Sequence, residues 1–223
     1  STILLKMVND LKPDYIISTN DLPKPTHRHL AYEDYKGTRE KSDDELAHQL
    51  GRAKDVFTAF GIPTYEAEGY EADDVIGTIV EKTKRKKNLE VIIASGDMDT
   101  LQLVQEDRVK VYTMRKGLTD TVLYDEDAVQ ERFGFHSDLL PDYKGLRGDP
   151  SDNIPGIPGV GEKTATQLIQ AFGTLEDIYT AVKKGDEVLL EKGIKPRIIN
   201  LLKEHQEGAE FSKKLAIIHR DAP

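Results

Sequence analysis

An apolar run followed by two acids indicates the fold of this chain: Val91-Ile92-Ile93-Ala94-Ser95-Gly96-Asp97-Met98-Asp99. Four successive apolar residues are typical of a strand in a parallel sheet that is covered on both faces. Ligands bind at the carboxyl ends of strands in open α/β sheets, so Asp97 and Asp99 are candidates for a functional site. A plain turn after the strand is the alternative explanation for both acids.

Strands and helices alternate around this segment. Apolar periodicity predicts helices at 4–11, 43–60 and 72–84, and strands at 15–18, 109–113 and 121–124, the last two forming a hairpin around Lys116-Gly117. From Glu126 onward the pattern is almost entirely helical, broken by Gly and Pro. We therefore predict an α/β fold with a mostly parallel central sheet flanked by helices, followed by a helical subdomain. The division is expected at 1–145 and 146–223, and no internal repeat is evident.

Composition excludes several classes of protein. The 223 residues include no cysteine, which excludes disulfides, thiolate metal sites and a cysteine nucleophile, and fits a reducing cytoplasm. No apolar run is long enough to cross a membrane and no signal peptide is recognised, so we expect a cytoplasmic monomer without a membrane partner. The histidines show no zinc spacing.

Eight carboxylates form four tight groups along the chain. They are Asp21; Glu71, Asp73 and Asp74; Asp97 and Asp99; and Asp149 and Asp152. Clustered oxygen ligands suit Mg²⁺ or Mn²⁺, and two ions about 4 Å apart would need this many of them. Taken singly, the second group also fits acids at a helix N-terminus, and the last group fits a turn and a helix cap.

The net charge of −9 hides an uneven distribution. Without the eight clustered acids it falls to −1, and basic residues gather locally at Lys24, Arg28, Lys36, Arg39 and Lys41, at Lys82 to Lys87, and at Arg115 and Lys116. Bound divalent ions would offset the acids further. A nucleic-acid partner is therefore compatible with the charge, although a solvated face explains 82–87 equally well.

A glycine-rich loop follows the last acidic group: Gly156-Ile157-Pro158-Gly159-Val160-Gly161-Glu162-Lys163-Thr164-Ala165. Gly156, Gly159 and Gly161 allow positive φ and close backbone approach, and Lys163 and Thr164 open a helix that ends near 172. Backbone N–H groups at such a turn can grip phosphates without reading bases. A corner between two helices without a ligand is the alternative. Together with the acids, the loop indicates metal-dependent cleavage of a phosphodiester in DNA or RNA.

Three motifs resemble a known family. Segments 69–74 (Gly-Tyr-Glu-Ala-Asp-Asp), 95–99 (Ser-Gly-Asp-Met-Asp) and 148–156 (Gly-Asp-Pro-Ser-Asp-Asn-Ile-Pro-Gly) strongly resemble the 5′→3′ exonuclease domain of bacterial DNA polymerase I, within the flap endonuclease family. Residues 26–29 and 35–39 are similar to its helical arch, which would occupy about 22–60. The resemblance covers essentially the whole chain, and residues 215–223 are similar to the end of the nuclease domain in the polymerase.

The resemblance implies a structure-selective 5′ nuclease for DNA 5′ ends and 5′ flaps in replication and repair, in the bacterial nucleoid and fused to a polymerase. All eight acids would hold two Mg²⁺ or Mn²⁺ ions, with Arg28, Lys36 and Arg39 facing the scissile phosphate or 5′ strand. Tyr35 would stack on a base of the frayed end. Residues 156–164 would form a helix–hairpin–helix that holds the duplex, with K⁺ as a candidate ligand of its carbonyls.

One departure keeps a second function open. In the family an earlier strand carries another metal-binding Asp, and this chain starts too late to contain it. We therefore expect the chain to bind DNA but to cleave it slowly or not at all, as a non-catalytic module for branched DNA would. A haloacid dehalogenase-type phosphatase is a weaker alternative, based on Asp97-Met98-Asp99-Thr100 after an apolar strand.

Overall fold

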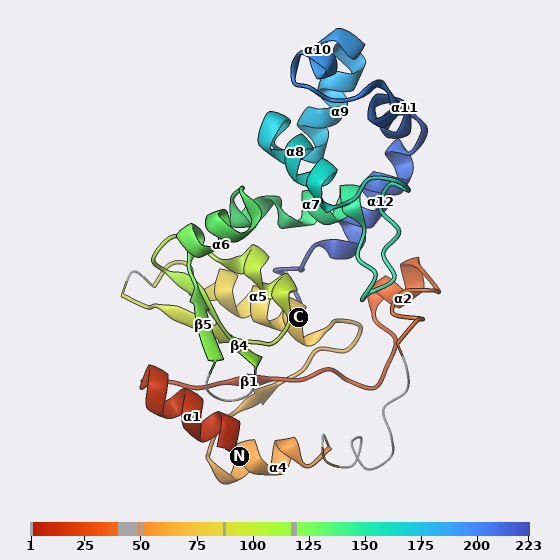
Figure 1. Cartoon of the computed structure of the whole chain (residues 1–223). Helices are drawn as coiled ribbons and strands as arrows, with labels where there is room; N and C mark the ends of the chain where they lie inside the picture. The colour runs from red at the N-terminus through yellow and green to blue at the C-terminus, as the bar shows by residue number, and fades with distance from the viewer. Residues whose placement is uncertain (1, 40–48, 50, 87, 117–119) are drawn as a thin grey trace.

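The computed structural model describes residues 2–39, 49, 51–86, 88–116 and 120–223, with the side chains of 115 and 116 left aside (Figure 1). Strands and the N-terminal helices form one part of the molecule. A group of helices from α8 to α11 forms the other, and α7 and α12 lie between them. The α/β fold with a helical C-terminal part is confirmed.

The strands form two small sheets. β1 (Ser18–Thr19) pairs in parallel with β2 (Thr64–Tyr65). β4 (Val109–Lys116) lies in the middle of the second sheet, parallel to β3 (Val91–Ala94) and antiparallel to β5 (Asp120–Tyr124). The strand predicted at 15–18 was wrong in its bounds, because Tyr15 is 85% exposed and only two residues find partners in β2.

Short helices precede the second sheet. They are α1 (Thr2–Leu11), α2 (His27–Ala31), α4 (Ala53–Ala59) and α5 (Ala72–Thr83). The predicted helix at 4–11 is confirmed, as is the one at 72–84, where Glu71 and Asp74 cap the first turn reciprocally. Of the helix predicted at 43–60, residues 43–48 and 50 lie outside the described part, and the helix α4 covers only 53–59.

Helices dominate after the second sheet, as the sequence predicts. They comprise the 3₁₀ turn η2 (Ser137–Leu139) and the α-helices α6 (Glu126–Phe133), α7 (Leu140–Arg147), α8 (Glu162–Phe172), α9 (Leu175–Lys184), α10 (Asp186–Glu191), α11 (Pro196–Glu204) and α12 (Gln206–Ala216). A further 3₁₀ turn, η1 (Met98–Leu103), lies within the second sheet, between β3 and β4. α8 ends at Phe172 with Gly173 as its C-cap, as predicted.

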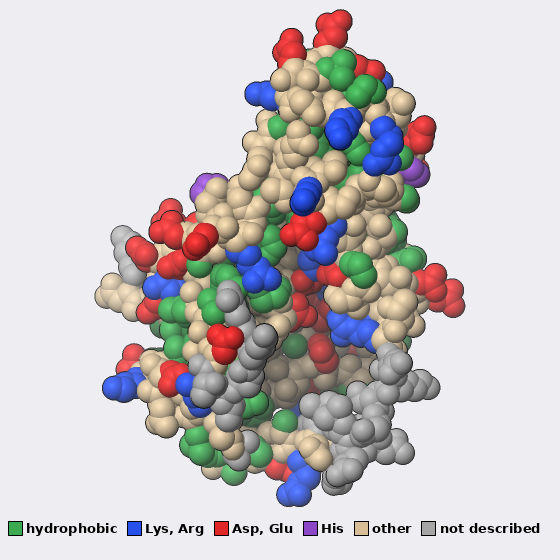
Figure 2. All heavy atoms as spheres, in the orientation of Figure 1, with side chains coloured by type: hydrophobic (Ala, Val, Ile, Leu, Met, Phe, Trp, Pro, Cys, Tyr) green, Lys and Arg blue, Asp and Glu red, His purple; other side chains and the backbone are tan. Residues whose placement is uncertain are grey.

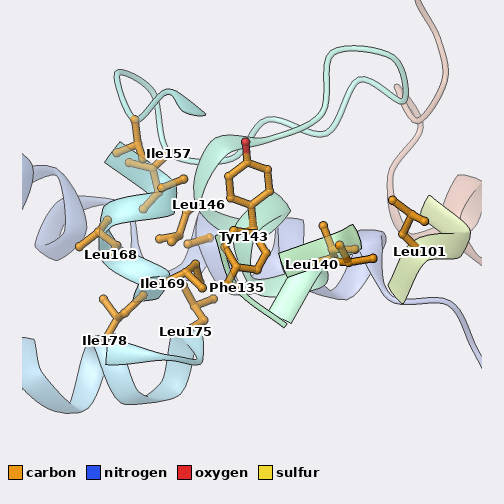
Figure 3. Close-up of a cluster of buried hydrophobic side chains, with 14 of the residues drawn as sticks. Leu101, Phe135, Leu140, Tyr143, Leu146, Ile157, Leu168, Ile169, Leu175 and Ile178 are labelled. Carbon is orange, nitrogen blue, oxygen red and sulfur yellow. The ribbon is translucent and has the colours of Figure 1, made fainter. Parts of the chain in front are cut away.

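The core runs through α7. Figure 3 shows Leu140, Tyr143 and Leu146 of this helix between Leu101 of η1 and Leu168 of α8. All belong to one buried hydrophobic cluster that extends from α5 and β3 to α12 and the C-terminal segment. Burial of side chains on both sides of α7 stabilises the position of the helical part relative to the sheet.

The C-terminal segment returns to the sheet part and lies along α5. The N–H of His219 donates to Asp74 Oδ1 at 2.8 Å, and the N–H of Ala222 donates to Thr78 Oγ1 at 2.9 Å. Gly77 leaves room for this segment, since a Cβ there would lie 2.7 Å from the His219 carbonyl oxygen.

Among the described helices, none is both long and apolar enough to cross a membrane.

Candidate metal centre and nucleic-acid interface

Acids from separate elements meet in one hollow. In Figure 2, Asp and Glu side chains gather in the recess in the middle of this face, with Lys and Arg along its edges. Asp97 and Asp99 follow β3, and Asp73 lies in the first turn of α5. Asp21 follows β1, and its Oδ1 accepts from the N–H of Ala72 at 2.7 Å. Element ends therefore converge these carboxylates, as strand ends do in open sheets.

Asp73 lies where the negative charges of the hollow are concentrated. Burial raises its pKa, and the negative charges of Asp97, Asp99, Glu71 and Asp21 raise it further, to about 7. A carboxyl group surrounded by other carboxylates is held in its charged form only at a free-energy cost. The donor set therefore fits a hard divalent cation, which would remove that repulsion.

Lys144 of α7 is a member of this site that the sequence analysis missed. Its ammonium contacts Asp99 and lies 2.5 Å from Asp149 Oδ2. Burial alone would raise the pKa of Asp149, but Lys144 outweighs burial and lowers it to about 2. For Asp99, burial dominates over Lys144 and raises the pKa to about 6. The available signal was a lysine four residues after Leu140, on the face that α7 buries.

Asp152 is tied to the basic segment before residue 40. Tyr35 Oη donates to its Oδ2 at 2.9 Å, and Arg39 Nη2 donates to its Oδ1 at 2.5 Å. Lys36 Nζ donates to Glu71 Oε1 at 2.8 Å and lies 4.0 Å from Asp152. Lys36, Arg39, Glu71 and Asp152 are thus brought together by the structure.

Tyr35 lies elsewhere than the stacking role requires. Its side chain is 3% exposed, and its ring meets His29 edge to face at 5.2 Å. A ring this deeply buried, with Lys36 Nζ over it at 5.1 Å, offers no free face to a nucleotide base. The structure therefore gives Tyr35 the position of a support for Asp152 and Glu71.

Arg28 and Asp74 are buried beside Glu71, whose Oε2 accepts from Arg28 Nη1 at 3.4 Å, and their main contacts lie outside the acidic hollow. Arg28 is 3% exposed and donates to both Asp74 oxygens at 2.8 Å, while Asp74 is fully buried. The same guanidinium donates to the carbonyls of Leu215 and Ile217. With these acceptors in place, Arg28 has no face for a phosphate and Asp74 has no lone pair directed at a metal site. Both residues join α2, α5 and the C-terminal segment.

A pocket of about 390 Å³ opens beside the acids. Its walls include Asp21, Glu71, Lys36 and Arg39, together with the Pro23–Thr26 segment. Cations on one wall and carboxylates on the other can accommodate a phosphate beside a metal ion. In the present arrangement, however, no three acidic or histidine side chains of the described residues converge on one metal position.

The glycine loop is built as a tight corner. Gly156 and Gly159 have positive φ of 61° and 87°, and a Cβ on Gly156 would lie 2.1 Å from the Gly148 nitrogen. Gly161 has φ −94°, so the expectation of positive φ fails there, and no atom would contact a Cβ within 4 Å. It caps α8, whose exposed Lys163 and half-buried Thr164 follow. Gly161 is therefore open to an approaching ligand.

Solved structures share this fold. The T5 5′-exonuclease, determined with divalent metal ions (zinc), matches with a TM-score of 0.76 at 23% identity, over 96% of this chain and 78% of that chain. The T5 D15 flap endonuclease, in a pseudo-enzyme-product complex with DNA and metal ions, matches with a TM-score of 0.77 at 22% identity, over the same shares. The fold is thus that of the T5 5′ nucleases.

Two family models divide the chain between them. The 5′-3′ exonuclease N-terminal resolvase-like domain matches residues 1–134, and the 5′-3′ exonuclease C-terminal SAM fold matches residues 135–223. The chain belongs to the 5′-3′ exonuclease family. DNA polymerase I of Bacillus caldotenax is 41% identical over 99% of the chain, and that of Bacillus subtilis (strain 168) is 42% identical over 99%. The chain spans about a quarter (24%) of the length of these relatives.

Proposed function

We propose that this chain is a structure-selective 5′ nuclease that hydrolyses phosphodiester bonds in DNA at 5′ ends and 5′ flaps. The observation that carries the proposal is the gathering of carboxylates from separate elements around Asp73, whose pKa burial and these charges raise, beside a pocket walled in part by Lys36 and Arg39. This combination suits a cation and a phosphate side by side. Family membership supports nuclease chemistry rather than a phosphatase with Asp97 as its nucleophile.

Divalent ions, Mg²⁺ or Mn²⁺, would be held by the acids of the hollow. The proposed set is Asp21, Glu71, Asp73, Asp97, Asp99, Asp149 and Asp152, with a pair of ions in view of the number of oxygens. Such ions supply a water of lowered pKa and a positive charge at the leaving oxygen. Lys36 and Arg39 would stabilise charge that develops on the scissile phosphate.

The other residues of the expected set, charged and uncharged, have supporting or DNA-holding roles in this proposal. Arg28 and Asp74 hold α2 against α5 and the C-terminal segment. Tyr35 positions Asp152 and Glu71. The loop 156–164 would hold the duplex through backbone N–H groups, with Lys163 near the phosphates and K⁺ on loop carbonyls.

Cleavage of a 5′-labelled flap duplex tests the proposal. If the chain is the nuclease, it releases the flap with Mg²⁺ and not after chelation, and its binding weakens as salt rises. Asp99→Asn should lower cleavage by more than the roughly 10–100-fold that loss of an outer-shell group costs. Asp138→Asn is the matched control, an exposed acid outside the hollow. Cleavage that persists without divalent ions, or equally in Asp99→Asn, would reject the metal site.

A non-catalytic branched-DNA-binding module is the second candidate. It is favoured by the present arrangement of the described acids, since Lys144 bridges Asp99 and Asp149 and no three carboxylates converge on one position. Tight flap binding with no product in Mg²⁺ or Mn²⁺ would select this function over the nuclease.

A further inference from the structure

The helical part contains a second hairpin that repeats the glycine loop. Residues 193–195 lead from α10 into α11 much as residues 159–161 lead into α8, and residues 196–199 and 162–165 form the first turns of these two helices. Gly193 has φ 75° where Gly159 has 87°. The next residues, Ile194 and Val160, are buried at 2% and 3% exposure.

Helix starts are equivalent in the two hairpins. Gly161 and Lys195 are extended N-caps, and α8 and α11 begin at the following residue. The Ala165 N–H donates to the Gly161 carbonyl at 2.9 Å, and the Ile199 N–H donates to the Lys195 carbonyl at 3.2 Å. This puts Lys163 and Arg197 at the same helical position. Gly161, Glu162 and Thr164 have the dissimilar counterparts Lys195, Pro196 and Ile198, which explains why the residue pattern alone did not reveal the repeat.

The two hairpins face each other. Arg197 Nη2 donates to the Gly159 carbonyl at 3.3 Å, and Gln167 Nε2 donates to the Gly193 carbonyl at 3.4 Å. Between them lies a pocket of about 310 Å³, lined by Lys163, Thr164, Gln167, Ile194, Lys195, Arg197 and Ile198. Each hairpin therefore supplies one wall of the same pocket.

The pocket is strongly cationic. Three of its lining side chains are cations and none is an acid. No carboxylate of the described residues forms an ion pair with the three pocket cations, Lys163, Lys195 and Arg197. Other surface cations do have such partners, as Lys203 has in Asp186. The first N–H groups of α8 also lack partners within the helix, and the helix dipole favours an anion there. Pro196 removes one such N–H from α11, so side-chain charge must dominate on that wall.

We propose that this pocket binds a backbone phosphate of double-stranded DNA, so that residues 193–197 form a second duplex contact beside the glycine loop. The inference rests on the proposed function and deepens it. Phosphate contacts fix the position of a duplex without reading its sequence. Two hairpins of similar geometry on one pocket would hold the duplex at the helical part of the molecule. The 5′ end of the same DNA would then reach the acidic hollow.

Binding of blunt and 5′-flap duplexes, measured by fluorescence anisotropy, tests the pocket. The chain is compared with Lys195→Gln, Arg197→Gln and Lys195→Arg, from about 0.05 to 0.2 M salt. We expect each Gln variant to bind both duplexes about tenfold more weakly near 0.1 M salt, with a salt slope smaller by about 0.9. Lys195→Arg should restore both quantities. Lys192→Gln is the matched control, an exposed lysine of the same loop outside the pocket lining.

Each outcome decides between the two levels of the proposal. If the unaltered chain binds neither duplex, the proposed function and this inference both fail. If it binds and Lys195→Gln behaves like Lys192→Gln, only the inference fails. If Arg197→Gln alone weakens binding, its bond to Gly159 accounts for the loss and the phosphate site is rejected. Melting temperatures measured on the same samples exclude unfolding as the cause.

Discussion

The acidic hollow lowers the stability of the folded chain chiefly through Asp73. Its raised pKa means that the folded chain binds a proton near neutral pH that the unfolded chain has already released. The folded state is therefore penalised as pH rises from about 4 to about 7, the reverse of the usual behaviour of a paired carboxylate. A divalent cation would relieve this penalty.

Asp73→Asn should stabilise the metal-free chain. Replacing the carboxylate with an amide of the same shape removes repulsion from its four acidic neighbours. We expect a gain of about 2 to 4 kcal/mol at pH 8 and none near pH 3.5, where the carboxyl is protonated in both states. Urea unfolding with a chelator at both pH values measures this. A gain equal at both pH values would show that charge is not its source.

Arg28→Met should destabilise the fold whether or not DNA is present. It leaves the fully buried Asp74 without its partner, which costs about 3 to 5 kcal/mol. Burial alone would raise the pKa of Asp74, but Arg28 outweighs burial and lowers it. The ion pair therefore stabilises the fold above about pH 4, and its contribution is lost as pH falls through the lowered pKa.

Arg39→Met is the comparison variant for Arg28→Met, and urea unfolding measures the stability of both. Arg39 is half exposed, so its ion pair with Asp152 is screened and should contribute less than about 1 kcal/mol. We expect Arg39→Met to retain its stability and to lose cleavage instead. Equal losses of stability in the two variants would contradict the division between a buried support and a site residue.

At the scale of elements, the glycines of the loop have different roles. Gly156 is needed for the tight turn, whereas Gly161 leaves space beside the backbone. Gly156→Ala forces a Cβ against the Gly148 backbone at a positive φ, and should cost about 3 kcal/mol or more. Gly161→Ala meets no atom and should change stability by less than about 0.5 kcal/mol. Thermal unfolding and duplex binding measured together should show a fold defect for the first and weaker binding with intact stability for the second.

α7 is the element that joins the two parts of the chain. It packs against α8, α9 and α12, and its Lys144 reaches the acids after β3. The second family model begins at residue 135, before α7. The division expected at residue 145 falls inside α7 and stays a prediction.

At the scale of the whole molecule, the C-terminal segment closes the fold over α5. Gly77→Ala places a methyl group 2.7 Å from both the His219 carbonyl oxygen and Ile218 Cγ2. We expect residues 217–223 to detach and stability to fall by about 1 to 3 kcal/mol, the usual cost of overpacking. Hydrogen exchange of the His219 and Ala222 N–H groups measures the detachment. Unchanged protection at both positions would show that the segment is held by other contacts.

The sequence by itself determined the elements and the chemistry. Apolar periodicity located β3, the hairpin of β4 and β5, and helices α1 and α5, because burial on one face leaves a pattern in consecutive residues. Acids at element ends identified Asp97 and Asp99 for the same reason, since the end of a strand can be read locally. The glycine loop was equally local, with its helix start within one residue of the prediction.

Only the tertiary structure decided which charges face one another. Lys144 lies between Asp99 and Asp149, Arg28 is buried against Asp74, and Tyr35 supports Asp152, although these residues are far apart along the chain or carry no local signal. The second hairpin at 193–199 was hidden for a related reason: its helix start repeats that of the glycine loop, while only its first glycine, the next apolar residue and one cation match in residue type. Partners of a charged group depend on packing between distant segments, and their free energies depend on the burial that packing creates.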